Sequence, residues 1–184
     1  MATERIMHKP STYPAARART CASLFAALLA LTGNPVPACD FPGLDAEADL
    51  ALHATVPKAV AASVDEARAP AVSAGALWEV TLHPLDAVNF ARPPGREAAV
   101  ATHAGLLRFP VPTRGRWRVA LSDGSWVDLV DGGVIVPSFK HGGDGACERM
   151  HKVVDFHVPL EREVLIQLSG ARATKLRLSL RPLP

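Results

Sequence analysis

Residues 107–123 read LRFPVPTRGRWRVALSD, and residues 154–170 read VDFHVPLEREVLIQLSG. The two segments align without a gap at an offset of 47 residues, with the identical pairs Phe109/Phe156, Val111/Val158, Pro112/Pro159, Leu121/Leu168 and Ser122/Ser169. In each copy, apolar and polar residues alternate before and after the proline, a pattern typical of two half-buried strands joined by a turn. The internal repeat therefore predicts two similar hairpins, one in each half of a β-sandwich.

Alternation with a period of two residues extends over most of the chain from residue 77 to residue 181. Turn signals that contain glycine, proline or aspartate interrupt it at 93–95, 123–124, 131–133 and 169–170. Strands that alternate in this way bury one face of an antiparallel sheet and expose the other. Roughly seven or eight such strands predict a mainly β fold, an antiparallel β-sandwich or jelly roll.

The sequence divides into a signal peptide over residues 1–38, an alanine-rich lead-in over 39–75 and a β-sandwich domain over 76–184. Within the lead-in, residues 44–53 and 57–68 each have the composition of a short helix. The second segment begins with a proline, which is common in the first turn of a helix. We therefore expect a short helical or irregular segment ahead of the strands.

The N-terminal region has the layout of a secretory signal peptide. Basic residues ending at Arg19 precede the apolar run CASLFAALLAL at 21–31, and Val36-Pro37-Ala38 has the small residues of a cleavage site. The apolar run is too short to cross about 30 Å of hydrocarbon as a helix. An amphipathic or core helix is the alternative interpretation. The leader predicts a periplasmic or secreted mature chain with no transmembrane span.

Cleavage after residue 38 would leave two cysteines, Cys39 and Cys147. An even pair in an exported chain is typical of a disulfide. Closing a loop of this length stabilises a fold by about 4–5 kcal/mol in the chain-entropy model. Two alternatives remain open, namely a lipid anchor on Cys39, with residues 36–39 as a lipobox, and two free thiols.

The charge balance argues against a nucleic-acid partner. Four of the 20 basic residues and one of the 18 acidic residues lie in residues 1–38, which leaves 16 basic and 17 acidic residues in the remainder. Proteins that bind nucleic acid need a basic face to replace the counterions of the phosphates. The mature chain has no such excess of positive charge.

The motif F-x-V-P … G-x-W-x-V-x-L-S-D, followed by D-F-x-V-P … V-x-I-x-L-S-G, resembles the pre-peptidase C-terminal type of β-sandwich and similar jelly-roll accessory modules of secreted bacterial proteins. This resemblance covers roughly residues 105–181. The whole layout also resembles a group of small exported bacterial proteins, which share Ala-Cys-Asp at the mature start, a Trp-Val-Asp strand as at 126–128, a His-Gly … Cys loop and a terminal Leu-Ser-Gly hairpin. Some of that group carry the name homogentisate 1,2-dioxygenase, an enzyme that is a far longer iron cupin. The resemblance implies an exported β-sandwich module.

A metal site is the sharpest chemical hypothesis. A period of two places His151, Asp155 and His157 on one face of a strand, and two imidazoles with a carboxylate are ligands of non-haem iron or zinc. These residues span about 20 Å along an extended chain, so other ligands would have to help. His141, together with Asp144 and Cys147, lies in the preceding loop and could supply them. The alternative is a solvated polar face opposite Val154, Phe156 and Val158.

Three further sets of residues are candidates for binding. Asp123, Asp128 and Asp131 flank two turns and could hold Ca²⁺, although turn chemistry alone explains the Asp-Gly pairs. Trp126 could form a carbohydrate-binding face, because both faces of its strand contain apolar residues, whereas Trp78 and Trp117 lie on apolar phases and are expected in the core. Arg108 is a candidate ligand-binding residue, within a set of polar-phase arginines that otherwise indicates a solvated sheet face and includes Arg116, Arg118, Arg177 and Arg181.

Two classes of function follow. The first is an exported, non-catalytic β-sandwich protein with a binding or accessory role, with no cofactor, and with a small molecule, a glycan or an envelope protein as its partner. The second is a small cupin-like enzyme of dioxygenase type that depends on iron or zinc. No phosphate-binding loop and no G-x-S-x-G nucleophile motif occurs in the sequence. The sequence therefore favours the binding protein.

The leader generates the first prediction. Intact-mass measurement of exported protein is expected to give a chain that begins at Cys39, because cleavage follows the small residue at position 38. A mature chain that retains residues 21–31 would contradict this, and an added lipid mass on Cys39 would favour the lipoprotein.

Overall fold

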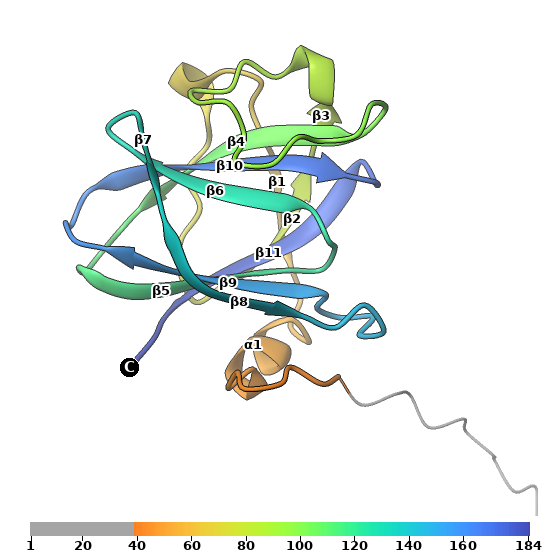
Figure 1. Cartoon of the computed structure of the whole chain (residues 1–184), viewed down its shortest axis with the longest axis vertical. Helices are drawn as coiled ribbons and strands as arrows, with labels where there is room; N and C mark the ends of the chain where they lie inside the picture. The colour runs from red at the N-terminus through yellow and green to blue at the C-terminus, as the bar shows by residue number, and fades with distance from the viewer. Residues whose placement is uncertain (1–38) are drawn as a thin grey trace, which may run out of the picture. The chain divides into compact units, whose positions relative to one another are not determined.

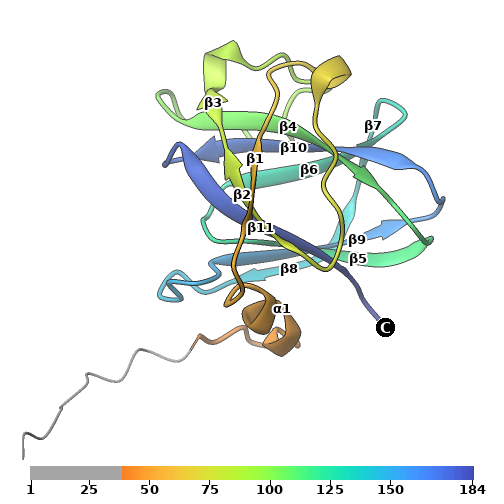
Figure 2. The same ribbon diagram turned by 180° about the vertical axis from the view of Figure 1, so that it is seen from behind.

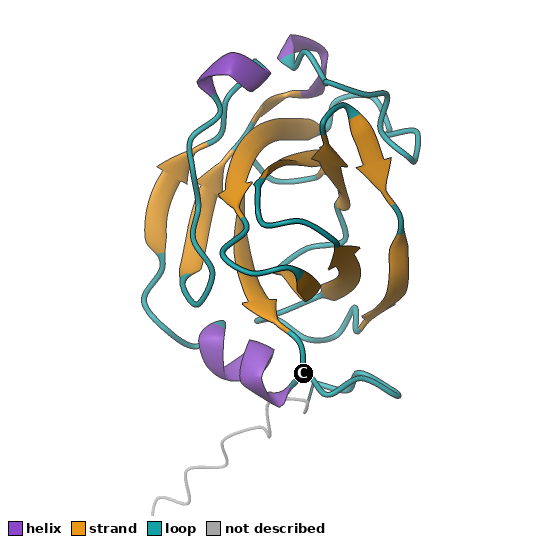
Figure 3. Ribbon diagram, turned by 90° about the vertical axis from the view of Figure 1, so that its left-hand side faces the viewer, coloured by secondary structure: helices purple, strands orange, loops and turns teal. Residues whose placement is uncertain are grey.

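The computed structural model describes residues 39–184, which form eleven strands in two sheets (Figures 1 and 2). The six-stranded sheet has the order β1-β2-β11-β5-β9-β8, and the five-stranded sheet has the order β3-β4-β10-β6-β7. The strands are β1 (Lys58–Ala61), β2 (Leu77–Thr81), β3 (His83–Pro84), β4 (His103–Pro110), β5 (Gly115–Leu121), β6 (Trp126–Asp131), β7 (Val134–Val136), β8 (Ser138–Gly143), β9 (Lys152–Val158), β10 (Glu163–Ala171) and β11 (Lys175–Pro182). The short helix α1 (Glu47–Leu52) lies on one outer side of the pair of sheets in Figure 3, and the two 3₁₀ helices, Glu66–Arg68 and Leu85–Ala87, lie on the opposite side.

Strand pairing in the two sheets is nested. β2 pairs with β11, β4 with β10, β5 with β9, and β6 with β7, all antiparallel. The early strands of the chain therefore pair with the late ones, and the innermost pair is a simple hairpin. This order, folded over into two packed sheets, is that of a jelly roll. The predicted β-sandwich is confirmed.

The two repeated segments are arches, so the prediction of two hairpins is wrong. β4 and β5 lie in different sheets, as do β9 and β10, because the chain crosses from one sheet to the other at Pro112 and again at Pro159. The arches pair with each other: Phe109 lies opposite Val164, and Trp117 lies opposite Phe156. At the offset of 47 residues, Phe109 corresponds to Phe156 and Trp117 corresponds to Val164. The two pairings are therefore equivalent under exchange of the arches, and the register has a pseudo-twofold symmetry.

The core lies between the two sheets. Its largest fully buried side chains include Phe109, Trp117 and Phe156 from the two arches. The rings of Phe109 and Trp117 meet edge to face, with centroids 5.0 Å apart, the geometry that aromatic quadrupoles favour. The alternation in the sequence therefore identified the inward rows correctly.

The lead-in differs from expectation in its second half. α1 lies inside the helix expected over 44–53, but residues 57–68 contain β1 and a 3₁₀ helix in place of one helix. β1 is an edge strand that pairs in parallel with β2, and the chain then follows the free edge of β4, with bridges at Ser63 and Ala71. Tertiary pairing here overrides the helix propensity of an alanine-rich segment.

Helix α1 covers the outer face of the six-stranded sheet through buried ion pairs. Arg118 of β5 donates to both carboxylate oxygens of Asp155 on β9, at 2.6 and 2.9 Å, and to Asp49 of α1 at 3.1 Å. Arg181 of β11 donates to the other oxygen of Asp49 at 2.7 Å. Asp49, Arg118 and Asp155 are at most 4% exposed. The expected solvated polar face is therefore wrong for Arg118 and Asp155, because a distant segment covers it.

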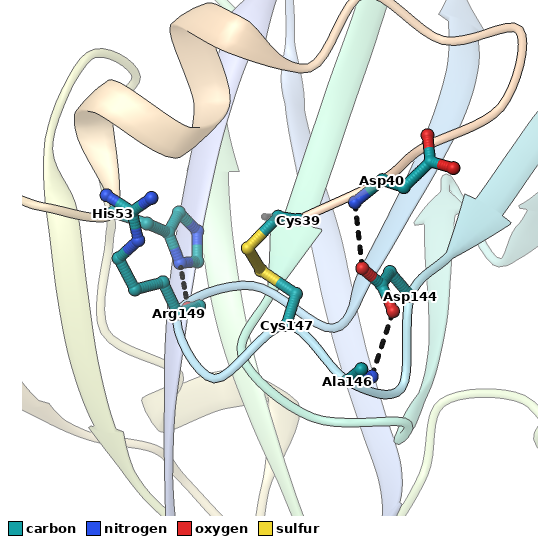
Figure 4. Close-up of a disulfide and its surroundings, with 7 residues drawn as sticks. All are labelled: Cys39, Asp40, His53, Asp144, Ala146, Cys147 and Arg149. Atoms are coloured by element: carbon teal, nitrogen blue, oxygen red, sulfur yellow. Dashed lines mark hydrogen bonds between the residues drawn. A yellow bond between two sulfur atoms is a disulfide. The ribbon is translucent and has the colours of Figure 1, made fainter. Parts of the chain in front are cut away.

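The disulfide joins Cys39 to Cys147 and attaches the start of the lead-in to the loop before β9 (Figure 4). The two cysteines pack with Phe41 and Met150 in a small apolar cluster beneath α1. Nearby, the carboxylate of Asp144 accepts a hydrogen bond from the amide of Asp40 at 2.8 Å, which lowers the pKa of Asp144.

His53 follows α1 and is buried against the sheet. Its Nδ1 donates to the carbonyl oxygen of Arg149, and its Nε2 lies 3.2 Å from the hydroxyl of Ser179. Burial lowers the pKa of His53, so the neutral imidazole is the form that the fold accommodates.

Loss of the disulfide is expected to loosen the lead-in while the strands remain. In a Cys147→Ser variant we expect the free energy of unfolding to fall by about 2–4 kcal/mol, equivalent to roughly 5–15 °C in melting temperature. Limited proteolysis should cleave faster within residues 39–57. A Cys39→Ser variant should behave identically, and adding reductant to either variant should change nothing further. Unchanged melting and proteolysis would contradict the stabilising role.

The Asp49 carboxylate is expected to be essential for docking α1. Asp49→Asn keeps the shape and removes the charge that faces two guanidinium groups, and breaking a buried pair in this way costs about 3–5 kcal/mol. The matched control is Asp45→Asn, an exposed aspartate whose carbonyl oxygen, and not its side chain, contacts Arg118 and Arg181. Urea denaturation should show no more than about 0.5 kcal/mol for the control. Equal effects of the two substitutions would refute the role of the charge.

Candidate ligand site beside Trp126

A gap at the edge of the five-stranded sheet opens the sandwich beside Trp126. β7 pairs only with residues 129–131 of β6, because the chain then continues past Pro137 into β8 of the other sheet. The segment between β7 and β8 crosses between the sheets in Figure 1. Within residues 39–184, the first half of β6, from Trp126 to Asp128, therefore pairs with β10 on one side and with no strand on the other.

A pocket of about 330 Å³ lies at this gap, and we call it the Trp126 pocket. Its walls come from β6, β7, β8 and β9, and most of them are apolar. The apolar lining side chains are Trp126, Val127, Ile135, Val136, Pro137, Val154 and Phe156, and the polar ones are Asp128, Ser138, His141 and Lys152. Such a combination of apolar walls and a few polar groups is typical of small-molecule sites.

Lys152 occupies an inward position at the start of β9. It lies two residues before Val154 and four before Phe156, both of which are in the core, so the three side chains share one face of the strand. The ammonium group lies 4.8 Å from the centroid of the Trp126 ring and donates to the carbonyl oxygen of Ser125 at 3.0 Å. Burial lowers the pKa of Lys152, and the positive charge of Arg96 adds to this effect. The site therefore holds a partly desolvated cation against an aromatic face.

Asp128 fixes the orientation of Trp126. One carboxylate oxygen accepts a hydrogen bond from the indole nitrogen at 2.9 Å, and the other accepts one from the amide of Gly95 at 2.9 Å. A Cβ atom at Gly95 would lie 3.0 Å from the Asp128 oxygen and 3.2 Å from the indole nitrogen, so a glycine suits this close approach. Asp128 thus links the Trp126 side chain to the backbone of the loop that contains Gly95.

A second, polar pocket of about 580 Å³ shares Trp126 with the first. Its lining contains side chains of both charges, among them Arg96, Glu97, Asp123, His151 and Arg172. The hydroxyl of Ser169, which also lines this pocket, is buried and has no hydrogen-bond partner within residues 39–184. Trp126 therefore separates an apolar pocket from a polar one.

The residues of the metal hypothesis are dispersed. Asp155 is bound to Arg118 beneath α1, His157 is exposed on the same strand, His151 lines the polar pocket, and His141 lines the Trp126 pocket. Asp144 accepts backbone hydrogen bonds, and Cys147 is in the disulfide. In the part of the chain from 39 to 184, no three histidine, cysteine or acidic side chains form a group that could hold a metal ion.

The other candidates from the sequence also separate. Asp123 accepts hydrogen bonds from Ser125, Asp128 binds Trp126, and Asp131 pairs with Arg162, so the three aspartates serve three different contacts. Arg108 pairs with Glu163 and lies opposite Leu165, four positions along β10 from the residue that pairs with Trp126. Trp117 is buried as expected, whereas Trp78 is half-buried and donates to the carbonyl oxygen of Ser73.

Of the candidates, the structure brings Trp126, Asp128 and His141 to one pocket and adds Lys152, which was not a candidate. The sequence does contain a signal for Lys152, since it is the one charged residue in the inward row of 152–158. That signal becomes informative only when the gap beside β6 is known.

A scan against protein-family models found no matching family, and a search of curated proteins found no match. Between residues 39 and 184, no helix is both long enough and apolar enough to span a membrane.

Proposed function

We propose that this protein is an exported, non-catalytic binding protein, periplasmic or secreted, that holds a small ligand with an apolar body in the Trp126 pocket. The observation that supports this function is a volume of about 330 Å³ with apolar walls at the open edge of a sheet. Protein interiors are close-packed and contain few voids larger than a water molecule. A pocket of this size lies in the range that small-molecule sites occupy.

The walls of the Trp126 pocket belong to the framework of the fold. Val127 lies on β6, which pairs with β10 in one sheet, and Val154 lies on β9, which pairs with β5 in the other. The disulfide and α1 brace the outer face of the sheet that carries Val154. A preformed site needs little reorganisation on binding and therefore loses little affinity to ordering. This supports binding as the role of the site.

Export is supported by two independent features. The N-terminal layout is that of a secretory leader. The Cys39–Cys147 pair is of the kind that persists in oxidising compartments outside the cytosol.

Binding of a neutral apolar probe tests the proposal. N-phenyl-1-naphthylamine, whose fluorescence rises in apolar surroundings, is expected to bind wild-type protein saturably at one site. Val136→Trp should abolish this binding, because Val136 is 8% exposed and lines the pocket. Val134→Trp is the matched control, since Val134 is on the same strand, is 65% exposed and is not part of the lining.

A second variant, Val154→Phe, enters the same pocket from the opposite sheet and should also abolish binding. Circular dichroism and cooperative unfolding establish that each variant is folded. Absence of saturable binding to the wild type, or equal binding to the Val136 and Val134 variants, would overturn the proposal. Binding of a soluble oligosaccharide in place of the apolar probe would indicate a glycan partner at the polar pocket.

A further inference from the structure

We propose that Lys152 is the anion-binding residue of the Trp126 pocket and that the ligand is a small apolar monocarboxylate. This inference rests on the proposed function and specifies the chemical class of its ligand. It starts from the position of one cation in the inward row of β9.

An ammonium group in an apolar row is costly unless it is paired. Lys152 shares its face of β9 with Val154 and Phe156 and contributes to the lining of a mainly apolar pocket. Lysine seldom occupies buried positions without a partner, because desolvation penalises the charged form. Lys152 is only partly buried and its head can reach the opening of the pocket, and a counter-ion from the protein or from a ligand would stabilise its charge further.

The described part of the chain gives Lys152 no direct ion pair, although the carboxylates of Asp123 and Asp128 act on it through space and oppose the lowering of its pKa. Lys152 forms none of the salt bridges found within residues 39–184. Its ammonium group contacts the Trp126 ring and the carbonyl oxygen of Ser125. Both oxygens of Asp128 accept hydrogen bonds from Trp126 and Gly95, and one oxygen of Asp123 accepts two from Ser125.

An ammonium group has three donor positions, and the Ser125 carbonyl accepts from one of them. A carboxylate at the pocket would accept from the remaining donors in a charge-assisted hydrogen bond, which is shorter and stronger than a neutral one. Burial lowers the pKa of Lys152, and a bound carboxylate would act in the opposite direction. The desolvation that now disfavours the charge would be offset by the ligand.

Charge and volume restrict the ligand further. The lining contains one cation, Lys152, and one carboxylate, Asp128, which matches a monoanion better than a phosphate dianion. The apolar volume of about 330 Å³ exceeds a cavity of roughly 150 Å³ that accepts benzene. By the same comparison, we expect the apolar part of the ligand to contain roughly six to ten carbon atoms, either aliphatic or aromatic.

Displacement of the neutral probe measures the role of the charge. Octanoate is a carboxylate with an aliphatic body, and benzoate is one with an aromatic body. Octanamide and benzamide are their neutral counterparts. On wild-type protein at pH 7.5, at least one acid should displace N-phenyl-1-naphthylamine at about tenfold lower concentration than its amide, as expected for a charge-assisted bond. The stronger acid identifies the type of apolar body.

The variants locate the effect at Lys152. Lys152→Met keeps the unbranched stem and should remove the preference for the acid, while Lys152→Arg should restore most of it. Lys175→Met, which removes an exposed cation paired with Glu79 on β2, is the matched control and should leave the preference unchanged. The acid–amide comparison on the wild type needs no variant, so a folding defect in one of them leaves the test valid.

The outcomes separate this inference from the proposed function. If the probe binds but acid and amide displace it equally, Lys152 does not bind an anion, and the binding function stands alone. If the acid preference survives in Lys152→Met, another cation is responsible and the assignment fails. If the probe does not bind at all, both proposals fall.

Discussion

The nested antiparallel pairing of the two arches is the constraint on which the rest of the structure depends. Phe109 lies opposite Val164 in one sheet, and Trp117 lies opposite Phe156 in the other. Because each arch contributes one strand to each sheet, these pairings bring the sheets face to face and place the aromatic side chains between them. The pairing is non-local, so its loop-closure entropy must be offset by the burial of this shared core.

The same constraint explains where the pocket lies. In a nested arrangement the innermost pair, β6 and β7, is closed by a tight turn at Gly132 and Gly133, both of which have positive φ. β7 is short, and the chain then continues into the other sheet, so half of β6 has no neighbouring strand on that edge among the described residues. The inward row of β9 begins beside this gap, and its first residue is Lys152. A polar residue at the end of a core row is tolerated because its head can reach the opening.

On the outer face of the six-stranded sheet, polar side chains are buried because α1 packs over them. Arg118 and Asp155 are neighbours on adjacent strands, and α1 places Asp49 over them with Arg181 alongside. The four side chains carry two positive and two negative charges, so the cluster is neutral as a whole. The disulfide lies in the apolar cluster beside these ions and holds the beginning of the lead-in in place.

Sequence and tertiary structure determined different things about this protein. The period-two alternation was sufficient for the strands, for the inward rows such as Phe109 and Phe156, and for the class of fold, since it reports which face of a strand is apolar. The pair Cys39 and Cys147 favoured a disulfide once Cys21 was assigned to the leader, but a lipid anchor and free thiols stayed open until the structure placed the two sulfur atoms together. Alternation does not report which strand lies next to which, so the hairpins proved to be arches, and residues 57–68 became an edge strand and a 3₁₀ helix. Nor does it report whether a remote segment covers a polar face, so the burial of Arg118 and Asp155 beneath α1 and the approach of Lys152 to Trp126 were decided only when distant parts of the chain packed together.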